Sequence, residues 1–144
     1  MKVTSRRRLW LAVALTSVSF LLFAFSVAGP VAGEGRYIAE PLLSSLCHRL
    51  PDRSLGLPWG TTGLCARCTA FWLGLGAGSM FFCRYGSRIP FWTGAVALLP
   101  LLVDGTLQLH TEYQSSNALR VVTGLAAGLG VAVVFFGKHD PKEG

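Results

Sequence analysis

The segment CHRLPDRSLGLPWGTTGLCARC, residues 47–68, gathers soft metal ligands between two long apolar runs. It contains three of the four cysteines and one of the three histidines of the chain. Cys47 and His48 are adjacent. The CARC motif then separates Cys65 and Cys68 by two residues, a spacing that lets both sulfurs face one point. Two thiolates from such a turn, with a third thiolate and an imidazole, form a tetrahedral zinc site. We therefore expect the two ends of the segment to fold together around zinc or another transition metal.

Three kinds of site remain open for these cysteines: a metal site, a redox pair of thiols and a structural disulfide. Metal binding leads, because it accounts for His48 as well as for the sulfurs. Adjacent side chains rarely both reach one ion, so Cys47, Cys65 and Cys68 are the stronger candidates and His48 is the weaker one. With His48 as the fourth ligand the site would be closed and structural, whereas without it a position would stay open for water or substrate.

The redox interpretation has support of its own. Cys65 and Cys68 lie at the predicted start of a helix with Arg67 between them, and both the helix dipole and the guanidinium favour thiolate. Attachment of a c-type haem is excluded, because it requires a histidine directly after the second cysteine, where this chain has Thr69. Cys83 lies far along the same predicted helix and is expected only to pack.

The apolar content of the chain indicates that its solvent is a membrane. Of 144 residues, 51% are hydrophobic and only 14% are charged, which is too apolar for an ordinary soluble domain. The apolar residues come in runs near the ~20 residues that a spanning helix needs. We predict an all-α integral membrane bundle of about four transmembrane helices. It forms a single domain over residues 1–144, with helices near 9–29, 66–83, 90–109 and 118–137 and an outer loop over 33–64.

The basic residues predict the orientation of these helices. With a cytoplasmic N-terminus, eight of the 13 Lys and Arg residues fall inside and five outside, which agrees with the excess of positive charge on cytoplasmic loops. The inner set is Lys2, Arg6, Arg7, Arg8, Arg84, Arg88, Lys138 and Lys142, and the outer set is Arg36, Arg49, Arg53, Arg67 and Arg120. We expect a multi-pass protein of the cell membrane with both termini cytoplasmic and the Cys/His loop on the outer side.

Two alternatives to this interpretation have less support. The first apolar run could be a cleaved secretory signal, but its apolar core exceeds the typical ~7 to 15 residues, which favours a retained helix. The net charge of +6 could indicate nucleic-acid binding. The basic residues are scattered among loops, however, and form no stripe with stacking aromatic residues, so no nucleic-acid partner is expected.

The loop after the first helix and the glycines of later helices carry further expectations. Residues 38–46 predict a short interfacial or re-entrant helix. Prolines and glycines between Pro51 and Gly63 predict irregular structure, with Trp59 as an anchor at the level of the lipid headgroups. Small residues recur at intervals of four in the second and fourth helices, which predicts close helix approach within one chain or between two copies. These residues are Gly74, Gly78, Gly124 and Gly128.

A second group of polar residues falls in the predicted third and fourth helices. Asp104 and Gln108 are four residues apart, and Asn117 and Arg120 share one face at the start of the next helix. A carboxylate within a membrane is costly unless it is paired, and Arg120 or Arg67 is the expected counter-ion. Either this pair only fixes helix packing, or Asp104 acts as a general base, proton carrier or substrate ligand while Arg120 recognises an anionic group.

The backbone near Asp104 is expected to be irregular. Pro100, four residues earlier, cannot donate a hydrogen bond, and Gly105 loosens the helix beside the acid. Together they predict a broken helix at a polar site. His110, near the end of this run, is expected to lie at the membrane interface and to bind no metal.

These motifs together resemble the domain of unknown function twenty eighty-five family, uncharacterised small polytopic membrane proteins of bacteria and archaea. The resemblance rests on CHRLPDRS at 47–54, CARCTAFWLG at 65–74, DGTLQ at 104–108 and NALRVVTG at 117–124, which occur in the family's order. The family's marked positions fall on Cys47, His48, Pro51, Arg53, Ser54, Cys65, Arg67, Cys68, Asp104, Gly105, Gln108, Asn117 and Arg120.

The chain departs from the family pattern at few positions. Arg49 stands where the family often has Gln, Ala70 where Gly is usual, and Trp72 where Tyr is usual. These departures affect the expected packing more than the expected site. The resemblance implies a polytopic membrane fold and the location of a site, and it implies no reaction.

Three hypotheses about function remain open. The first is a metal-dependent membrane enzyme that acts on an anionic or lipid-linked substrate. The second is a membrane thiol-disulfide oxidoreductase that uses Cys65 and Cys68, and the third is a non-catalytic scaffold stapled by its metal. Membrane lipid and a second copy of the chain are the other expected partners. The candidate catalytic residues are Asp104, Arg120, Arg67, Gln108, Asn117 and Arg53.

Overall fold

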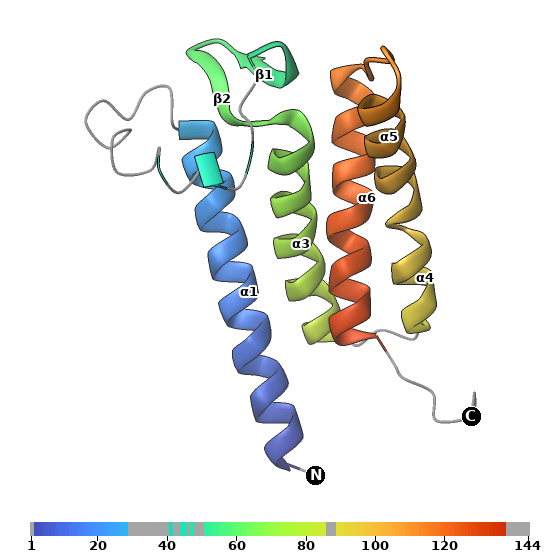
Figure 1. Cartoon of the computed structure of the whole chain (residues 1–144). Coiled ribbons are helices and arrows are strands. Elements are labelled where there is room, and N and C mark those ends of the chain that lie inside the picture. Colours follow the sequence, from blue (N-terminus) through green and yellow to red (C-terminus); the bar gives the residue numbers. More distant parts are fainter. Residues whose placement is uncertain are drawn as a thin grey trace.

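In the part of the chain that the structure describes, four helical segments run side by side (Figure 1). The computed structural model describes residues 2–28, 41, 44, 45, 47, 51–85 and 89–137 of the 144. The segments are α1 (Lys2–Ala28), α3 (Ala66–Tyr85), α4 (Phe91–Val96) followed by α5 (Leu99–His110), and α6 (Asn117–Phe136). Helix α3 lies between α1 and α6, and α4 packs against α6. The prediction of an all-α bundle is confirmed.

The burial pattern is that of a bundle surrounded by lipid. Covered positions hold small polar side chains, among them Ser19, Ser26 and Ser79, each 0% exposed. Large apolar side chains such as Trp10 and Phe135 are exposed instead. Lipid tails can solvate such outer faces, while small residues at the contacts let the helices approach closely.

Three segments are long and apolar enough to cross a membrane: Arg6–Ala28, Phe91–His110 and Asn117–Phe136. The α3 helix is not among them, so the prediction of four spans is not confirmed. Its 20 residues are long enough, about 30 Å at 1.5 Å per residue. Seven of those 20 residues, however, are glycine, serine, threonine or arginine. This composition follows from its place in the bundle, because α3 packs against a helix on each side.

Helices α3 and α6 run in the same direction and pack closely at two glycines. A Cβ atom added at Gly124 would collide with the backbone carbonyl of Arg67, and one added at Gly128 with that of Phe71. Because each glycine faces rigid backbone, this approach requires the absence of a side chain. Of the two close approaches that the glycines allowed, the one within a single chain occurs, between α3 and α6.

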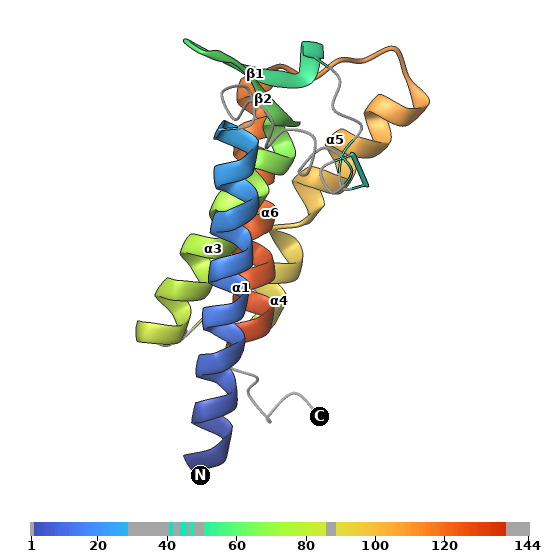
Figure 2. The same ribbon diagram turned by 90° about the vertical axis from the view of Figure 1, so that its left-hand side faces the viewer.

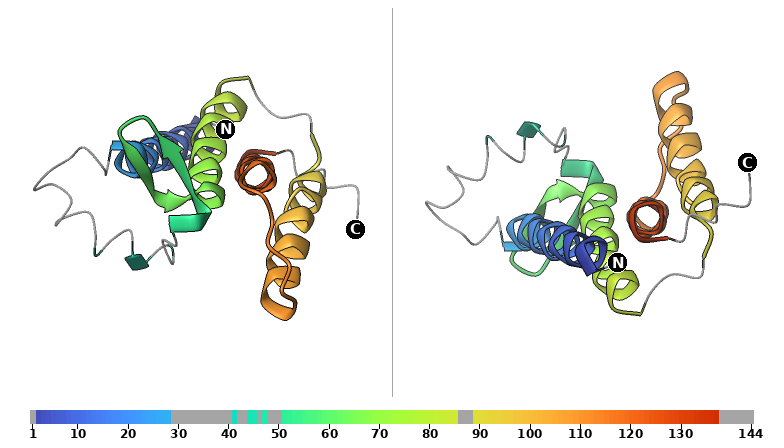
Figure 3. Two further views of the ribbon diagram at one scale, coloured as in Figure 1. Left: turned by 90° about the horizontal axis from the view of Figure 1, so that it is seen from above. Right: turned by 90° about the horizontal axis from the view of Figure 1, so that it is seen from below.

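The segment 90–109, predicted as one span with a break at the polar site around Asp104, is broken in two well before that site. Helix α4 ends at Val96, and α5 begins at Leu99 with Pro100 near its start. A proline is tolerated in the first turn of a helix but not in its interior, so a new helix starts just before Pro100. The expectation that Gly105 loosens the helix is wrong, because α5 continues through it to His110. Beyond the break, α5 tilts away from α6 (Figures 2 and 3).

A β-hairpin occupies part of the predicted loop, where irregular structure was expected. A short 3-10 helix, η1 (Pro51–Arg53), leads into β1 (Ser54–Leu57), which pairs antiparallel with β2 (Gly60–Cys65). Leu57 pairs with Gly60, so only two residues form the turn. Gly60 has a φ of 136°, which glycine adopts without strain. The proline and glycine that suggested irregular structure instead belong to the tight turn, Pro58 within it and Gly60 directly after it.

The hairpin lies at the end of the bundle where α1 ends and where α3 and α6 begin (Figure 1). The Trp59 indole donates a hydrogen bond of 3.2 Å to the carbonyl of Val27 and so ties the turn to the end of α1. The predicted interfacial helix at 38–46 lies outside the described residues, apart from Pro41, Ser44 and Ser45, which are helical. All the candidate site residues that the structure describes lie at this hairpin end.

Candidate metal centre and adjoining polar cluster

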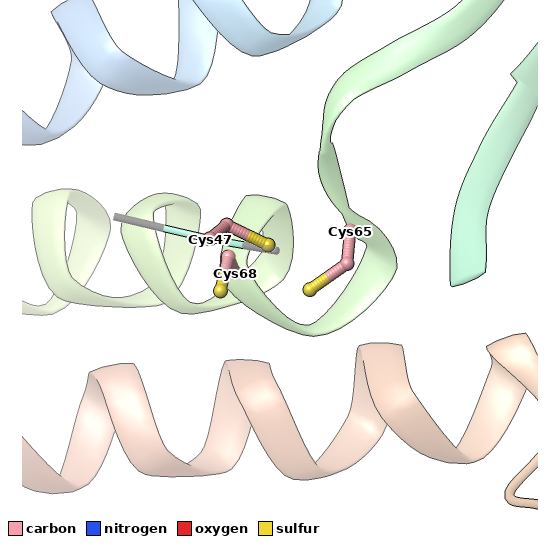
Figure 4. Close-up of side chains that lie close together, drawn as sticks. All are labelled: Cys47, Cys65 and Cys68. Atoms are coloured by element: carbon pink, nitrogen blue, oxygen red, sulfur yellow. The ribbon is translucent and has the colours of Figure 1, made fainter. Parts of the chain in front are cut away.

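Three cysteine sulfurs meet beside the first turn of α3 (Figure 4). The Sγ atoms of Cys47, Cys65 and Cys68 all lie within 4.8 Å of one another, and each side chain is half-buried. Cys65 ends β2 and Cys68 lies in the first turn of α3, so the strand-to-helix junction presents both sulfurs on one side. Cys47 joins them from a segment 18 residues earlier in the sequence. The structure thus brings together the two ends of the 47–68 segment.

The donor set fits a soft metal ion. A tetrahedral zinc with Zn–S bonds of about 2.3 Å holds its sulfurs about 3.8 Å apart. The separations here, up to 4.8 Å, need side-chain movements of only about half an ångström each to reach that geometry. Among the described residues these three are the whole group. His48, the predicted fourth ligand, lies outside the described residues.

Hydrogen bonds fix the junction that carries the cysteine pair. The Ser26 hydroxyl of α1 accepts a bond of 3.1 Å from the backbone N–H of Leu64 and shares one of 2.8 Å with Thr69. The Thr62 hydroxyl accepts from the N–H of Leu55 and donates to the carbonyl of Leu64. Such local bonds satisfy buried backbone groups where strand pairing ends. The sulfurs therefore project from a braced turn.

An apolar cluster lies under the sulfurs. Leu22 of α1 and Leu64 of β2 are buried against each other, and Cys47, Cys68 and Trp72 pack onto them. An apolar surround limits the access of water to a metal centre and strengthens its electrostatic interactions. The thiols are thus covered by apolar side chains on the side that faces the bundle.

The thiol of Cys65 is held in its neutral form more strongly than usual. Its pKa is raised: the hydrogen bond with Cys47 raises it most, the hydrogen bond with Cys68 lowers it by less, and burial raises it further. The expectation that the helix dipole and Arg67 make this residue a thiolate is therefore not met at Cys65. A neutral thiol loses its proton when a metal binds. Cys65 and Cys68 are not joined by a disulfide in this structure.

The predicted polar cluster forms next to these sulfurs and links α3, α5 and α6. Arg67 of α3 makes an ion pair with Asp104 of α5, whose side chain is 6% exposed. Gln108 donates to both oxygens of Asp104 at 3.4 Å and also donates to the Ser115 hydroxyl. The sequence allowed either Arg67 or Arg120 as the counter-ion of Asp104, and in the structure Arg67 makes the ion pair.

Arg120 is covered by its neighbours, with 3% of the residue exposed. Its Nε donates to the Ser115 hydroxyl at 3.1 Å, and its Nη1 donates to Asn117 Oδ1 at 3.0 Å. Asn117 in turn donates to the carbonyl of Ser54 at 3.3 Å, which ties α6 to the hairpin. Within the described part of the chain, Nη2 of Arg120 is buried without a hydrogen-bond partner.

The cysteine group and the polar cluster are electrostatic neighbours. Arg120 interacts with the charges of Arg53, Arg67 and Asp104, and also with Cys65. Arg53 is half-buried in η1, just before the hairpin. A metal ion or substrate bound at the sulfurs would therefore lie in the positive electrostatic potential of these guanidinium groups.

The sequence missed one member of the cluster. Ser115 is 5% exposed and accepts from both Gln108 and Arg120. It precedes Ser116, whose hydroxyl caps α6 by accepting from Leu119. Two adjacent serines before a helix suggest capping alone, so no sequence signal distinguished the one that points into the cluster. Elsewhere, Cys83 is half-buried near the far end of α3, and His110 is exposed at the end of α5.

Comparisons with known proteins agree with the membrane assignment. The model of a protein family described as a predicted membrane protein (DUF2085) matches residues 47–134. An uncharacterised protein of Methanocaldococcus jannaschii is 31% identical over 135 residues, covering 83% of this chain and 85% of the relative. An uncharacterised protein of Methanothermobacter thermautotrophicus is 38% identical over 96 residues, covering 62% and 83%. No solved structure matches the chain. The matched region contains every candidate site residue.

Proposed function

Because the chain belongs to the DUF2085 family of predicted membrane proteins, we propose that it acts in a membrane through a transition-metal centre. Cys47, Cys65 and Cys68 bind the metal, which the thiolate donor set suggests is zinc. His48 directly follows Cys47 and is the proposed fourth ligand. If His48 does not bind, the fourth position is open to water or substrate.

The convergence of three sulfurs carries this proposal. A structural disulfide uses two cysteines and has no need of a third within 4.8 Å. A site for a soft ion needs three or four such donors from a turn and a separate segment. The junction of β2 and α3 and the segment of Cys47 supply that combination.

As an enzyme, the protein would use the polar cluster beside the metal. A bound zinc supplies Lewis acidity, which polarises an oxygen or makes water more acidic. Asp104 is the one carboxylate of the cluster among the described residues and is the group that holds or transfers a proton, oriented by Arg67 and Gln108. Arg120 and Arg53 hold an anionic group of the substrate. The position at the hairpin end of a membrane bundle suits an anionic or lipid-linked substrate.

The proposed orientation places the hairpin end on the outer side of the cell membrane. The excess of Lys and Arg at the opposite ends of the helices supports cytoplasmic termini. The outer faces of the helices would contact lipid, and a second copy of the chain could also pack there. A reporter fused after the last helix, compared with one inserted at the turn of the hairpin, tests this orientation. An outward signal from the C-terminal fusion would overturn it.

Metal analysis of purified protein tests the metal centre. We expect about one metal ion per chain in the wild type. Cys65→Ser should lose it, and Cys83→Ser should keep it, since Cys83 lies far from the three sulfurs on α3. Metal-free wild-type protein containing a reversible disulfide between Cys65 and Cys68 would overturn the proposal.

That overturning result would establish the second candidate, a thiol-disulfide oxidoreductase. Its support is the proximity of Cys65 and Cys68 at a helix start, with Cys47 close enough to attack a disulfide formed between them. A non-catalytic scaffold is separated from an enzyme by Asp104→Asn. In a scaffold this change leaves cellular function intact whenever metal content and folding are intact, whereas in an enzyme it abolishes function under the same conditions.

A further inference from the structure

In the described part of the chain, the polar cluster carries more positive charge than its one carboxylate can balance. The guanidinium groups of Arg53 and Arg67 both lie within electrostatic range of the guanidinium group of Arg120. Asp104 is the only carboxylate that acts on Arg120 among the described residues, and it is ion-paired with Arg67. The hydrogen-bond partners of Arg120 are the neutral side chains of Ser115 and Asn117. A covered cation without an anion in contact is costly, so this arrangement calls for another negative group.

Two of these arginines also hold unused donors. Nη2 of Arg120 and Nε of Arg67 are buried and have no hydrogen-bond partner in the described ranges. Unpaired buried donors are rare in proteins, and those of a charged group are the most costly. Both side chains are held by their other contacts, so the unused N–H groups are fixed in place.

The local backbone adds to the positive potential. Arg67 lies in the first turn of α3, and Arg120 at the start of α6. Both helices have 20 residues and begin at the hairpin end of the bundle (Figures 1 and 2). The positive ends of two helix dipoles therefore face the region of the arginines.

We propose that Arg53, Arg67 and Arg120 bind a phosphate group. The three guanidinium groups come from η1, α3 and α6 and therefore approach from different elements. A carboxylate offers two coplanar oxygens, which one or two arginines satisfy, whereas a phosphate offers oxygens in several directions. This inference deepens the proposed function by naming its substrate class, and it depends on that function only for the role of the site.

The metal centre alone does not account for the arginines. Three thiolates around a divalent ion leave one negative charge, while the cluster, counted over the residues that the structure describes, carries three guanidinium groups and one carboxylate. One positive charge remains, which matches a phosphate with one or two negative charges. The phosphate can belong to a lipid headgroup or to a small soluble compound, and both would present the same oxygens.

Phosphate binding by the full chain in an uncharged detergent tests the inference. Inorganic phosphate is titrated by calorimetry as the soluble ligand. As the lipid ligand, short-chain phosphatidic acid is compared with a diacylglycerol of the same chains, which lacks only the phosphate. We expect Arg120→Gln to weaken binding about tenfold to a hundredfold, the usual effect of losing a charged hydrogen bond. Arg53→Gln tests the same site from η1 if Arg120→Gln does not fold, and Arg84→Gln, at the far end of α3, should bind like the wild type.

The outcomes separate this inference from the metal proposal. Equal phosphate binding by the wild type, Arg53→Gln and Arg120→Gln overturns the inference, even if the metal is present. Weakened binding in the arginine variants supports it, even if Cys65→Ser or the wild type contains no metal. Binding of phosphatidic acid but not of inorganic phosphate assigns the site to a lipid, and the reverse assigns it to a soluble compound. If neither ligand binds the wild type, the inference fails.

Discussion

The ion pair between Arg67 and Asp104 gives the sharpest stability prediction. Asp104 has 6% of its side chain exposed and Arg67 has 22%, so both charges are largely removed from solvent. Removing one partner of a buried pair costs about 3–5 kcal/mol, because the other charge stays buried without compensation. We expect Asp104→Leu to cost that amount. It leaves Arg67 without its anion, close to the like charge of Arg120.

The two halves of the pair should not be equivalent. In Arg67→Met, the carboxylate of Asp104 keeps Gln108 as a donor and Arg120 as a nearby cation. We therefore expect a smaller loss, about 1–3 kcal/mol. The double variant removes both charges, and an apolar pair in this position is close to neutral. It should be more stable than Asp104→Leu alone, so the second substitution rescues the first.

Reversible unfolding in mixed micelles, followed by circular dichroism, measures these free energies. Asp52→Leu serves as the control, because Asp52 is exposed in η1 and should change stability by less than about 0.5 kcal/mol. Simple additivity of the two losses would refute the reasoning, since uncoupled residues add. A cost of Asp104→Leu no larger than that of the control would refute it as well.

Other predictions concern helix packing, hydrogen bonding and metal uptake. Gly128→Leu should destabilise the bundle by at least about 2 kcal/mol, because the new side chain collides with backbone. Gly105→Leu should be tolerated in the same unfolding assay, since an added Cβ there meets nothing within 4 Å. Equal losses of stability in the two variants would contradict the described packing. Ser26→Ala should cost about 1–2 kcal/mol of stability, because the Ser26 hydroxyl makes two hydrogen bonds. Ser19→Ala should cost little, since that hydroxyl is buried without a partner in the described chain. A larger loss of stability in Ser19→Ala than in Ser26→Ala would be inconsistent with these hydrogen bonds. Metal affinity, measured by chelator competition, should rise with pH. The raised pKa of Cys65 keeps a proton on the thiol, and the metal must displace that proton. An affinity that stays constant with pH would be evidence against thiol ligation.

The parts of the site that the sequence predicted depend on short spacing and on the cost of charge in a membrane. The two-residue gap between Cys65 and Cys68 allows one side of a turn to carry both sulfurs, and a carboxylate such as Asp104 requires a cation. These constraints are local or chemical, so they are visible without coordinates. The meeting of Cys47 with the later pair was an expectation based on ligand chemistry, and the structure shows it.

The features that the sequence did not predict depend on distant contacts. The hairpin was missed because Pro58 and Gly60 suggest irregular structure unless the strands on either side are known to pair. The choice of Arg67 over Arg120 as the ion partner of Asp104 depends on how α3 and α5 are placed. The glycines and small polar residues of α3 likewise reflect packing on two sides, and α3 is not among the three segments that are long and apolar enough to cross a membrane.

X-ray absorption at the metal edge tests the central claim most directly, because it counts the donor atoms around the ion. The account predicts about three sulfur neighbours at about 2.3 Å with a lighter atom completing the shell, and about one sulfur fewer or no bound metal in Cys47→Ser. A metal coordinated only by nitrogen and oxygen, or a sulfur count unchanged by Cys47→Ser, would contradict it.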